Sequence, residues 1–500
     1  MSTTAVPENP LARMIPIVPV GAAPAGDVGD SLYEVHQKIY PRAVSGWFMT
    51  WRWLLVWATQ LVFYGLPWLR WDSHPLLLFD LEARKFYVGG LILWPQDIFL
   101  LTLLLISAAL GLFLFTAIAG RLWCGYACPQ TVYTELFLWI ERAIQGDRHQ
   151  QMRLDQGPRS IERIFKKSAT HVFWIALSLW TGLTLVGYFT PIRQLVPEIW
   201  DLKLGPWEAF WILFYGFATY GNAGFMREQV CKYMCPYARF QSAMIDSDSL
   251  IITYDSARGE PRGSRSRHAD AAALGLGACV NCGVCVEVCP TGIDIRHGLQ
   301  YECIGCAACV DGCNQIMDRM GYARGLIRYT TERALAEGFQ VAGIVRRIVR
   351  PRVVVYAVLL AAVVAGIGFE VLAREPIKVD VMRDRAVLAR TVQTSGGTDS
   401  IENVYRLQVM NQDGIAHRFQ ISATGMDGLT TRVAGEAADQ ADRFDLPAAS
   451  SRQIPISVRV PSADLKPGVV HIRLRVSALD DPKIATDEAT VFLVPADVLH

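Results

Sequence analysis

Cysteine is confined to one part of this chain. No cysteine occurs before Cys124 or after Cys313, and the twelve that are present fall into four groups between these positions. Clustered cysteines at ligand spacing indicate metal binding in a reducing compartment, and they argue against a disulfide-stabilised secreted domain. The tail after Cys313 is therefore expected to be a separate part of the protein, without thiol chemistry.

Charge is also scarce. Charged residues make up 19% of the 500 residues, hydrophobic residues make up 52%, and the net charge at pH 7 is +1. This composition favours a membrane protein. The small net charge, and the absence of a basic run with interleaved aromatic residues, argue against nucleic acid as a partner. The N-terminus lacks a charged-then-apolar signal peptide, so the first apolar span is expected to target the chain to the membrane.

Several cofactor signatures are missing. A b-type haem in a membrane bundle needs histidine pairs, and only His171 lies at an apolar span, where a hydrogen-bonded structural role is expected. The sequence has no G-x-G-x-x-G after a strand and no Walker loop. No catalytic triad or carboxylate pair is visible either. Nothing therefore predicts a haem, flavin or nucleotide site.

The densest motif is the stretch 279–313, which contains C-x2-C-x2-C-x3-C twice. Two such runs in tandem are typical of a two-cluster bacterial ferredoxin, in which the last cysteine of each run ligates the other cluster. Structural zinc is the alternative, but zinc favours paired C-x2-C motifs. We therefore assign one [4Fe–4S] cluster to Cys279, Cys282, Cys285 and Cys313, and the other to Cys303, Cys306, Cys309 and Cys289. Pro290 follows the first run as expected, whereas Asn314 replaces proline after the second.

Five apolar segments have the length of about 20 residues that a membrane helix needs. They are Trp47–Leu69, Asp97–Ala119, His171–Thr190, Trp207–Met226 and Val353–Leu372. Arg52, near the start of the first segment, can snorkel to the interface. Residues 70–95 carry short alternating pieces that predict a small hairpin.

Basic residues predict the orientation of these spans. The 120–170 connection carries eight lysines and arginines and four arginines flank the start of the fifth span, whereas residues 191–206 have only two basic residues. The positive-inside rule then places the N-terminus, the 120–170 connection and the 227–352 segment in the cytoplasm. Five crossings leave the C-terminus on the outside. The cysteine-rich stretch lies within the 227–352 segment and is therefore expected in the reducing compartment.

Two cysteine pairs lie at the cytoplasmic ends of predicted spans. GRLWCGYACPQ contains Cys124 and Cys128, and REQVCKYMCPY contains Cys231 and Cys235. Residues i and i+4 of a helix share a face, so each pair is expected to present two sulfurs one turn apart. The proline after each pair is expected to kink or restart the helix. Four converging thiols suit Cu(I) best, with zinc or another iron–sulfur centre as alternatives; inert buried cysteines are the simplest alternative.

The tail from about Lys378 has a different character. VYRLQVMNQDGIAHRFQIS alternates apolar and polar residues around an Asp-Gly turn, which predicts a hairpin. RQIPISVRV and GVVHIRLRVSAL repeat the alternation at a spacing typical of a sandwich. The tail is predicted to be one small β-sandwich that acts in interaction or stabilisation, because nothing in it resembles a catalytic site.

Particular motifs resemble the CcoG family, also called FixG or RdxA, the accessory proteins of cbb3-type cytochrome c oxidase. They are KIYPRAVSG (38–46), GRLWCGYACPQTVYTE (120–135), GFMREQVCKYMCPYARFQSAM (224–244), RGEPRG (258–263), PTGIDIRHGLQYECIGCAACV (290–310) and MGYARGLIRYTTE (320–332). The resemblance runs from about residue 35 to 335 and extends loosely to the tail, where the family has an immunoglobulin-like domain. It implies a multi-pass protein of the bacterial inner membrane that reduces Cu(II) to Cu(I) for oxidase assembly, with cytoplasmic clusters and a periplasmic C-terminal domain.

Three functions stay open from the sequence. The first is a cupric reductase that draws on a cytosolic electron donor, with the oxidase and copper chaperones or transporters as implied partners. The second is a quinol-linked electron-transfer subunit without a copper role, because polyferredoxins of periplasmic nitrate reductase systems share similar C-x3-C-P helices. The third is a scaffold with structural clusters. Membrane lipid is an expected contact, and a homo-oligomer is compatible with each function.

The sequence therefore predicts a multi-domain membrane protein. It combines a five-helix transmembrane bundle, a two-cluster bacterial ferredoxin-like module and a C-terminal immunoglobulin-like β-sandwich. The expected divisions are a cytoplasmic tail (1–45), helices one to four with the C-x3-C-P motifs (46–245), the ferredoxin-like domain (246–345), helix five (346–375) and the sandwich (376–500).

Overall fold

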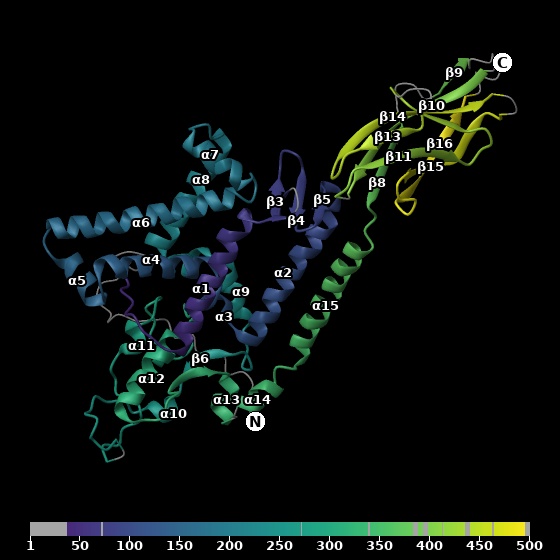
Figure 1. Ribbon diagram of the computed structural model, residues 1–500. Helices are drawn as coiled ribbons and strands as arrows, with labels where there is room; N and C mark the ends of the chain where they lie inside the picture. Colours follow the sequence, from purple (N-terminus) through teal and green to yellow (C-terminus); the bar gives the residue numbers. More distant parts are fainter. Residues whose placement is uncertain are drawn as a thin grey trace, which may run out of the picture. The chain divides into compact units, whose positions relative to one another are not determined.

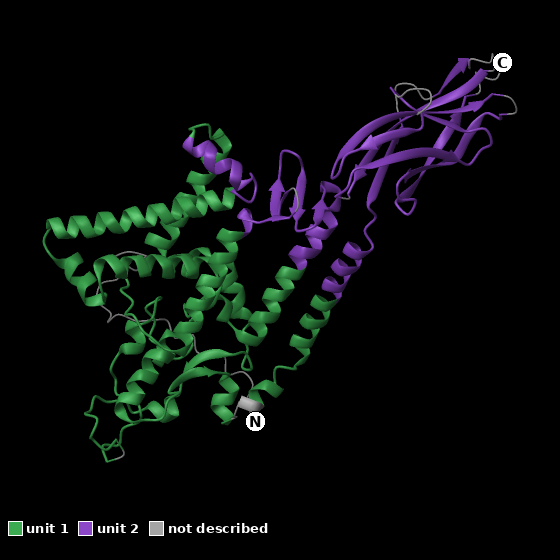
Figure 2. Cartoon of the chain, in the orientation of Figure 1, with its two compact units in different colours: residues 1–65, 107–186, 201–361 green, residues 66–106, 187–200, 362–500 purple. Residues whose placement is uncertain are grey.

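The computed structural model describes residues 38–71, 74–271, 273–338, 341–383, 389–393, 399–412, 414–435, 441–462 and 465–495. Most of the predicted N-terminal tail lies outside these residues. The chain divides into two compact units, each described here by itself (Figure 2). Unit 1 comprises residues 1–65, 107–186 and 201–361, and unit 2 comprises residues 66–106, 187–200 and 362–500. Unit 1 therefore holds all twelve cysteines.

Long helices occur between residues 47 and 372 (Figure 1). Within the described residues, three helical stretches are long and apolar enough to cross a membrane: Pro95–Ala119, Ile161–Val186 and Pro351–Leu372. They contain α2 (Ile98–Ala119), α6 (Ile161–Val186) and α15 (Pro351–Leu372). The predicted count of five is therefore reduced to three clear candidates.

The other two predicted spans also form helices, but shorter ones. The first predicted span is α1 (Trp47–Gly65), which ends before the predicted Leu69. The fourth predicted span is α8 (Pro206–Thr219), a 14-residue helix that continues as the π-helix η3 (Tyr220–Met226). Hydropathy alone did not reveal this change of helix type, and π-helical turns often occur at functional sites.

Shorter helices connect these long ones. They are α3 (Leu122–Tyr126), α4 (Pro129–Gln145), α5 (Arg148–Gln156), α7 (Ile192–Trp200), η4 (Val230–Met234) and α9 (Pro236–Met244). Between α1 and α2, the predicted hairpin is a three-stranded antiparallel sheet of β3 (Leu77–Asp80), β4 (Lys85–Val88) and β5 (Leu91–Leu93). The two-residue strands β1 (Arg70–Trp71) and β2 (His74–Pro75) pair beside it in the sequence.

The cysteine-rich stretch folds around one small sheet and one helix. Strand β6 (Ile251–Tyr254) pairs antiparallel with β7 (Ile327–Thr330). The helices of this segment include α11 (Val284–Glu287), α12 (Ala308–Met320) and the short α10, α13 and α14 (Ser256–Gly259, Glu332–Glu337 and Val341–Arg346). Buried Ile252, Met317 and Leu326 pack against the cysteines. The arrangement gives the cysteines an apolar core of their own.

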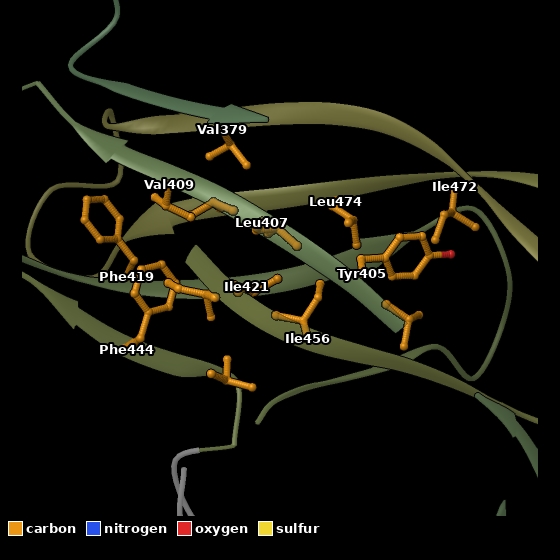
Figure 3. Packing of buried hydrophobic residues seen from close by; sticks show 14 of the residues in the cluster. Val379, Tyr405, Leu407, Val409, Phe419, Ile421, Phe444, Ile456, Ile472 and Leu474 are labelled. Atoms are coloured by element: carbon orange, nitrogen blue, oxygen red, sulfur yellow. The ribbon is translucent and has the colours of Figure 1, made fainter. Parts of the chain in front are cut away.

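The tail is a β-sandwich, as predicted. One sheet has the order β12–β14–β10–β8 with β9 on β10, and the other has the order β13–β11–β15–β16. The strands are β8 (Ile377–Arg383), β9 (Arg390–Gln393), β10 (Asp399–Asn411), β11 (His417–Thr424), β12 (Thr430–Val433), β13 (Arg443–Leu446), β14 (Ser451–Pro461), β15 (Gly468–Ala478) and β16 (Ala485–Val494). Figure 3 shows Tyr405, Leu407, Phe419 and Leu474 packed between the sheets, and all four side chains are buried.

The hairpin predicted around the Asp-Gly turn is wrong. Its two strands are β10 and β11, which belong to different sheets and do not pair with each other. Both strands alternate because each sends one face into the same core, with Val409 from one sheet and Ile421 from the other. Alternation of apolar and polar residues indicates a strand with one buried face, but it does not indicate which strand pairs with it. Asp413 of the predicted turn lies outside the described residues.

Candidate functional site

Eight cysteines gather around two cavities in the iron–sulfur module. One cavity is lined by Cys279, Cys282, Cys285 and Cys313, and the other by Cys289, Cys303, Cys306 and Cys309, with Cys285 also reaching its edge. Each cavity therefore takes three cysteines from one run and the fourth from the other. The crossed ligand assignment made from the sequence uses the same grouping and stays a prediction.

The two cysteine runs adopt the same backbone turn. Asn281 and Gly283 have positive φ angles of 55° and 72°, and Gly305 and Ala307, at the matching places of the second run, have 69° and 59°. Left-handed conformations are uncommon for residues other than glycine, because they cost energy. They persist where the surrounding structure imposes them, which is often at functional sites. Each repeated turn lies within a C-x2-C-x2-C run whose three cysteines line one cavity.

The chemistry of both cavities fits a [4Fe–4S] cluster. Beside the sulfurs, the walls are mainly apolar, with Ile293 and Ile304 at one cavity and Leu326 at the other. Burial raises the pKa of the Cys303 and Cys313 thiols to about 12. Cluster binding would therefore release protons, because iron binds the thiolate form.

Individual cysteines of the two cavities differ in their access to solvent. Cys282 is exposed, whereas Cys306 is buried. Cys306 belongs to a small apolar cluster with Val288, Ile304 and Ala308, and Cys124 of the first C-x3-C-P motif packs against this cluster. The cavity of Cys303, Cys306, Cys309 and Cys289 is therefore the one next to a membrane-edge cysteine.

The two C-x3-C-P motifs do not lie on continuous helices, contrary to the expectation. Helix α3 ends at Tyr126, and Cys128 is an extended residue (φ −62°, ψ 127°) that precedes α4. Cys231 lies in the π-helix η4, and Cys235 is again extended (φ −79°, ψ 109°). The reason is the proline: as the first residue of α4 or α9 it lacks an N–H, so the preceding helix stops and a new one begins.

The four membrane-edge thiols nevertheless share one neighbourhood. Burial, together with the nearby thiols of Cys128, Cys124 and Cys235, raises the pKa of Cys231 to about 12. Burial raises the pKa of Cys124 to about 11, and its Sγ donates to Oε1 of the fully buried Gln241 at 3.2 Å. Within the described residues, no three histidine, cysteine or acidic side chains are arranged to hold a single metal ion. Copper at Cys124, Cys128, Cys231 and Cys235 stays a prediction.

Gly125, between Cys124 and Cys128, lies against the backbone of the cavity lined by Cys303, Cys306, Cys309 and Cys289. A Cβ on Gly125 would lie 2.8 Å from the Cα of Cys306 and 2.8 Å from the carbonyl oxygen of Gly305. Arg121, four residues earlier, also connects neighbouring segments, because its guanidinium donates to the carbonyl oxygens of Tyr301 and Ala238. The motif was visible in the sequence, but nothing in it indicated that its glycine is a point of backbone contact.

Buried charges hold the surrounding helices. Arg52 does not snorkel to an interface as predicted: it is 3% exposed and pairs with Glu135 at 3.1 Å. Glu141 pairs with Arg227 at 2.8 Å and with Lys38 at 3.0 Å. The ion pair offsets the cost of removing the Arg52 guanidinium from water, so the side chain can stay buried. His171 forms a hydrogen bond, as expected for a structural histidine: its Nδ1 lies 3.0 Å from the Tyr220 hydroxyl.

Three family models match the chain. Residues 226–332 match a 4Fe-4S dicluster domain, residues 101–145 match a 4Fe-4S binding domain, and residues 367–495 match the IG-like fold at the C-terminal of FixG, putative oxidoreductase. The chain is therefore an iron–sulfur protein with an immunoglobulin-like C-terminal domain.

Relatives cover most of the chain. The Nitrogen fixation protein FixG of Rhizobium meliloti is 39% identical over 467 residues, covering 87% of this chain and 88% of that protein. Protein RdxA of Cereibacter sphaeroides is 39% identical over 432 residues, covering 85% of this chain and 89% of that protein. A crystal structure of a FixG-related protein from Vibrio parahaemolyticus matches 24% of this chain and 97% of its own, at 15% identity and a TM-score of 0.19. The identity and coverage of the two sequence relatives show that the chain belongs to the FixG/RdxA family.

Proposed function

We propose that this iron–sulfur electron-transfer protein reduces Cu(II) to Cu(I) at its membrane-edge thiols, for the assembly of a cbb3-type cytochrome c oxidase. In this proposal the chain crosses the bacterial inner membrane five times, through α1, α2, α6, α8 with η3, and α15. The cysteine cavities then face the cytoplasm and the sandwich faces the periplasm. The three clear candidate spans and the basic 120–170 connection support this arrangement.

The chain's own residues supply the binding chemistry. The four thiols offer soft ligands, and soft ligands favour Cu(I) over Cu(II), so their presence makes the reduction more favourable. When bound, clusters at the two cavities supply one-electron transfer. The ligand sets we propose for them are Cys279, Cys282, Cys285 and Cys313, and Cys303, Cys306, Cys309 and Cys289.

The observation that carries this proposal is the contact of Gly125 with Gly305 and Cys306. It sets the backbone between Cys124 and Cys128 directly on the backbone of a proposed cluster ligand. Two thiol groups with separate roles would not need such a contact. Electron transfer from a cluster to a bound metal needs a short distance between the two. Because glycine has no side chain, the backbone at Gly125 can approach the backbone of Cys306 closely.

The test is copper reduction by the full-length protein, purified anaerobically and reduced with dithionite that is then removed. Cluster absorbance and a Cu(I)-specific chelator are followed together after Cu(II) is added. We expect the clusters to reoxidise in step with the appearance of Cu(I). We expect the Cys124/Cys128/Cys231/Cys235→Ser variant to be slow, although its clusters are intact.

Ferricyanide is the control oxidant, because it accepts electrons without needing a thiol site. Wild type and the serine variant should reoxidise equally fast with ferricyanide. Reduced clusters that persist in the presence of Cu(II) would rule the copper reaction out. Equal copper rates in wild type and variant would remove the four thiols from it.

A further inference from the structure

The helical part of unit 1 contains a further cavity, and no cysteine is among the residues that line it. Its volume is about 420 Å³, within the range of about 300–1,000 Å³ that is usual for small-molecule sites. Side chains from α1, α4, α6, α8 and η3 line it. Ala127 and Pro129, the two neighbours of Cys128, form part of its wall. A ligand in this cavity would therefore lie beside a membrane-edge thiol.

One part of the cavity wall offers polar groups, and one of them is unsatisfied. Gln60 lines the cavity and is 6% exposed, and its Oε1 has no hydrogen-bond partner. Tyr133 and Thr181 line the cavity as well, and the Thr181 hydroxyl lies 2.8 Å from that of Tyr64. Leaving a buried amide oxygen unpaired destabilises the protein, because the oxygen has lost its hydrogen bonds to water. A ligand hydroxyl that donates to Oε1 of Gln60 removes this destabilising effect.

Another part of the wall is aromatic and aliphatic. Phe63, Leu185 and Tyr215 face the same cavity. The stretches of α1 and α8 that line it also carry strongly exposed apolar side chains, with Leu61 at 72% and Phe217 at 75% exposure. Exposed apolar side chains on a membrane helix are where a hydrocarbon chain lies favourably. The ligand class is therefore a flat ring with hydroxyl or carbonyl groups and an apolar tail.

A polar side chain links the cavity to the cysteine sites. Gln130 lines the cavity and also a small cleft shared by Cys231, Thr291 and Ile304. Its Nε2 donates to the carbonyl oxygens of Asn222 and Arg227, each at 3.0 Å. Gln130 thus holds η3 against the start of α4, the helix that Cys128 precedes.

We propose that this cavity binds the headgroup of a membrane quinol, and that the quinol is the electron donor. This inference rests on the proposed copper reaction and replaces the expected cytosolic donor. Oxidation of one quinol yields one quinone, two electrons and two protons. Two Cu(II) ions take up the electrons, so the balance is QH2 + 2 Cu(II) → Q + 2 Cu(I) + 2 H⁺, with the protons released to water.

The binding test uses decylubiquinone and the full-length protein in detergent, with quenching of tryptophan fluorescence as the readout. We expect saturable binding, weakened about three- to tenfold in Gln60→Met and Thr181→Val, as the loss of one hydrogen bond predicts. Thr184→Val is the matched control, because Thr184 is fully buried on the same helix and does not line the cavity. Its affinity should equal that of wild type.

Two results would overturn the quinol site. One is competition by 1-decanol as strong as that by decylubiquinone, since the cavity would then recognise only a tail, as a lipid chain would provide. The other is equal affinity in Gln60→Met, Thr181→Val and Thr184→Val.

Anaerobic addition of decylubiquinol to the oxidised protein separates this inference from the proposed function. Bleaching of the cluster absorbance without Cu(I) formation would keep the quinol site and reject the copper reaction. Copper reduction by dithionite-reduced protein, without any quinol binding, would do the reverse.

Discussion

The guanidinium Nη2 of Arg52 lies 3.1 Å from Oε2 of Glu135, and both side chains are at most 5% exposed. The other carboxylate oxygen of Glu135 receives Arg142 at 3.0 Å. This ion pair ties α1 to α4, the helix that begins directly after Cys128. The position of the first C-x3-C-P motif therefore depends on a buried charge pair, one member of which, Arg52, lies in another helix.

We predict that Arg52→Met destabilises the protein by about 3–5 kcal/mol, because it leaves a buried carboxylate with one partner fewer. Thermal unfolding in detergent measures the loss. The double variant Arg52→Met/Glu135→Met should recover most of it, because Arg142 is partly exposed and can be solvated. If the double variant is no more stable than the single one, the pair is not the cause.

The sequence could predict the ligand chemistry but not such contacts. The spacing of Cys279 to Cys313 is set by the cluster it has to hold, so the pattern alone identifies the cofactor. Arg52 was expected at an interface because a lone cation in an apolar segment is costly. Its partner Glu135 lies in another helix, and only the packing of α1 on α4 reveals it.

The β-sandwich shows the same limit. Alternation located β10 and β11 correctly, because alternation follows from one buried face. Their assignment to different sheets depends on the path of the chain between them, which alternation does not encode. The helix breaks at Pro129 and Pro236 were predictable for the opposite reason, since proline acts locally.

A second prediction concerns Gly125. We expect Gly125→Ala to lower the stability by about 1–3 kcal/mol, because the added methyl group meets the backbone of Gly305 and Cys306 and something must shift. The shift should slow copper reduction while the iron content stays normal. Stopped-flow reoxidation of the reduced clusters by Cu(II) measures this effect.

Gly111→Ala is the matched control for Gly125→Ala. Gly111 lies within α2, and a Cβ there meets nothing within 4 Å. Alanine is favoured over glycine inside a helix by about 0.5–1 kcal/mol, so the control should be neutral or slightly stabilising. Equal copper rates in the two variants would mean that the Gly125 contact does not matter for the reaction.

A third prediction concerns Asp311, a buried residue of α12. Its carboxylate accepts a hydrogen bond from the backbone N–H of Met49, in the first turn of α1, at 2.8 Å. We expect Asp311→Ala to cost about 0.5–2 kcal/mol, the usual loss when a helix start loses its side-chain acceptor. Asp318→Ala on the same helix should cost less, because Asp318 forms an exposed pair with Arg324.

Thermal melting and hydrogen exchange of the first turn of α1 distinguish the two aspartate variants. Only Asp311→Ala should increase exchange at Met49. Unchanged exchange in that variant would show that the carboxylate does not anchor the helix.

The last prediction is a pH dependence at Asp155 in α5. The Asp155 carboxylate receives the Tyr40 hydroxyl at 2.7 Å and Lys38 Nζ at 3.1 Å, so it holds the start of the described chain. Burial raises its pKa, but hydrogen bonds from Lys167 and Tyr40 and the charge of Lys38 outweigh this and lower the pKa from 3.8 to about 2.

A carboxyl group with a lowered pKa stabilises the fold only while it is ionised. The contribution of Asp155 is therefore fully present above pH 3.8 and is lost as the pH falls from 3.8 towards 2. We expect the protection of residues 38–42 from hydrogen exchange to be constant between pH 5 and 8, after correction for intrinsic rates. Asp155→Asn should lose this protection at pH 7, whereas Asp201→Asn, at an exposed pair with Lys203, should keep it. A loss of protection in wild type between pH 8 and 5 would point to a histidine and not to Asp155, because only histidine titrates there without a large shift.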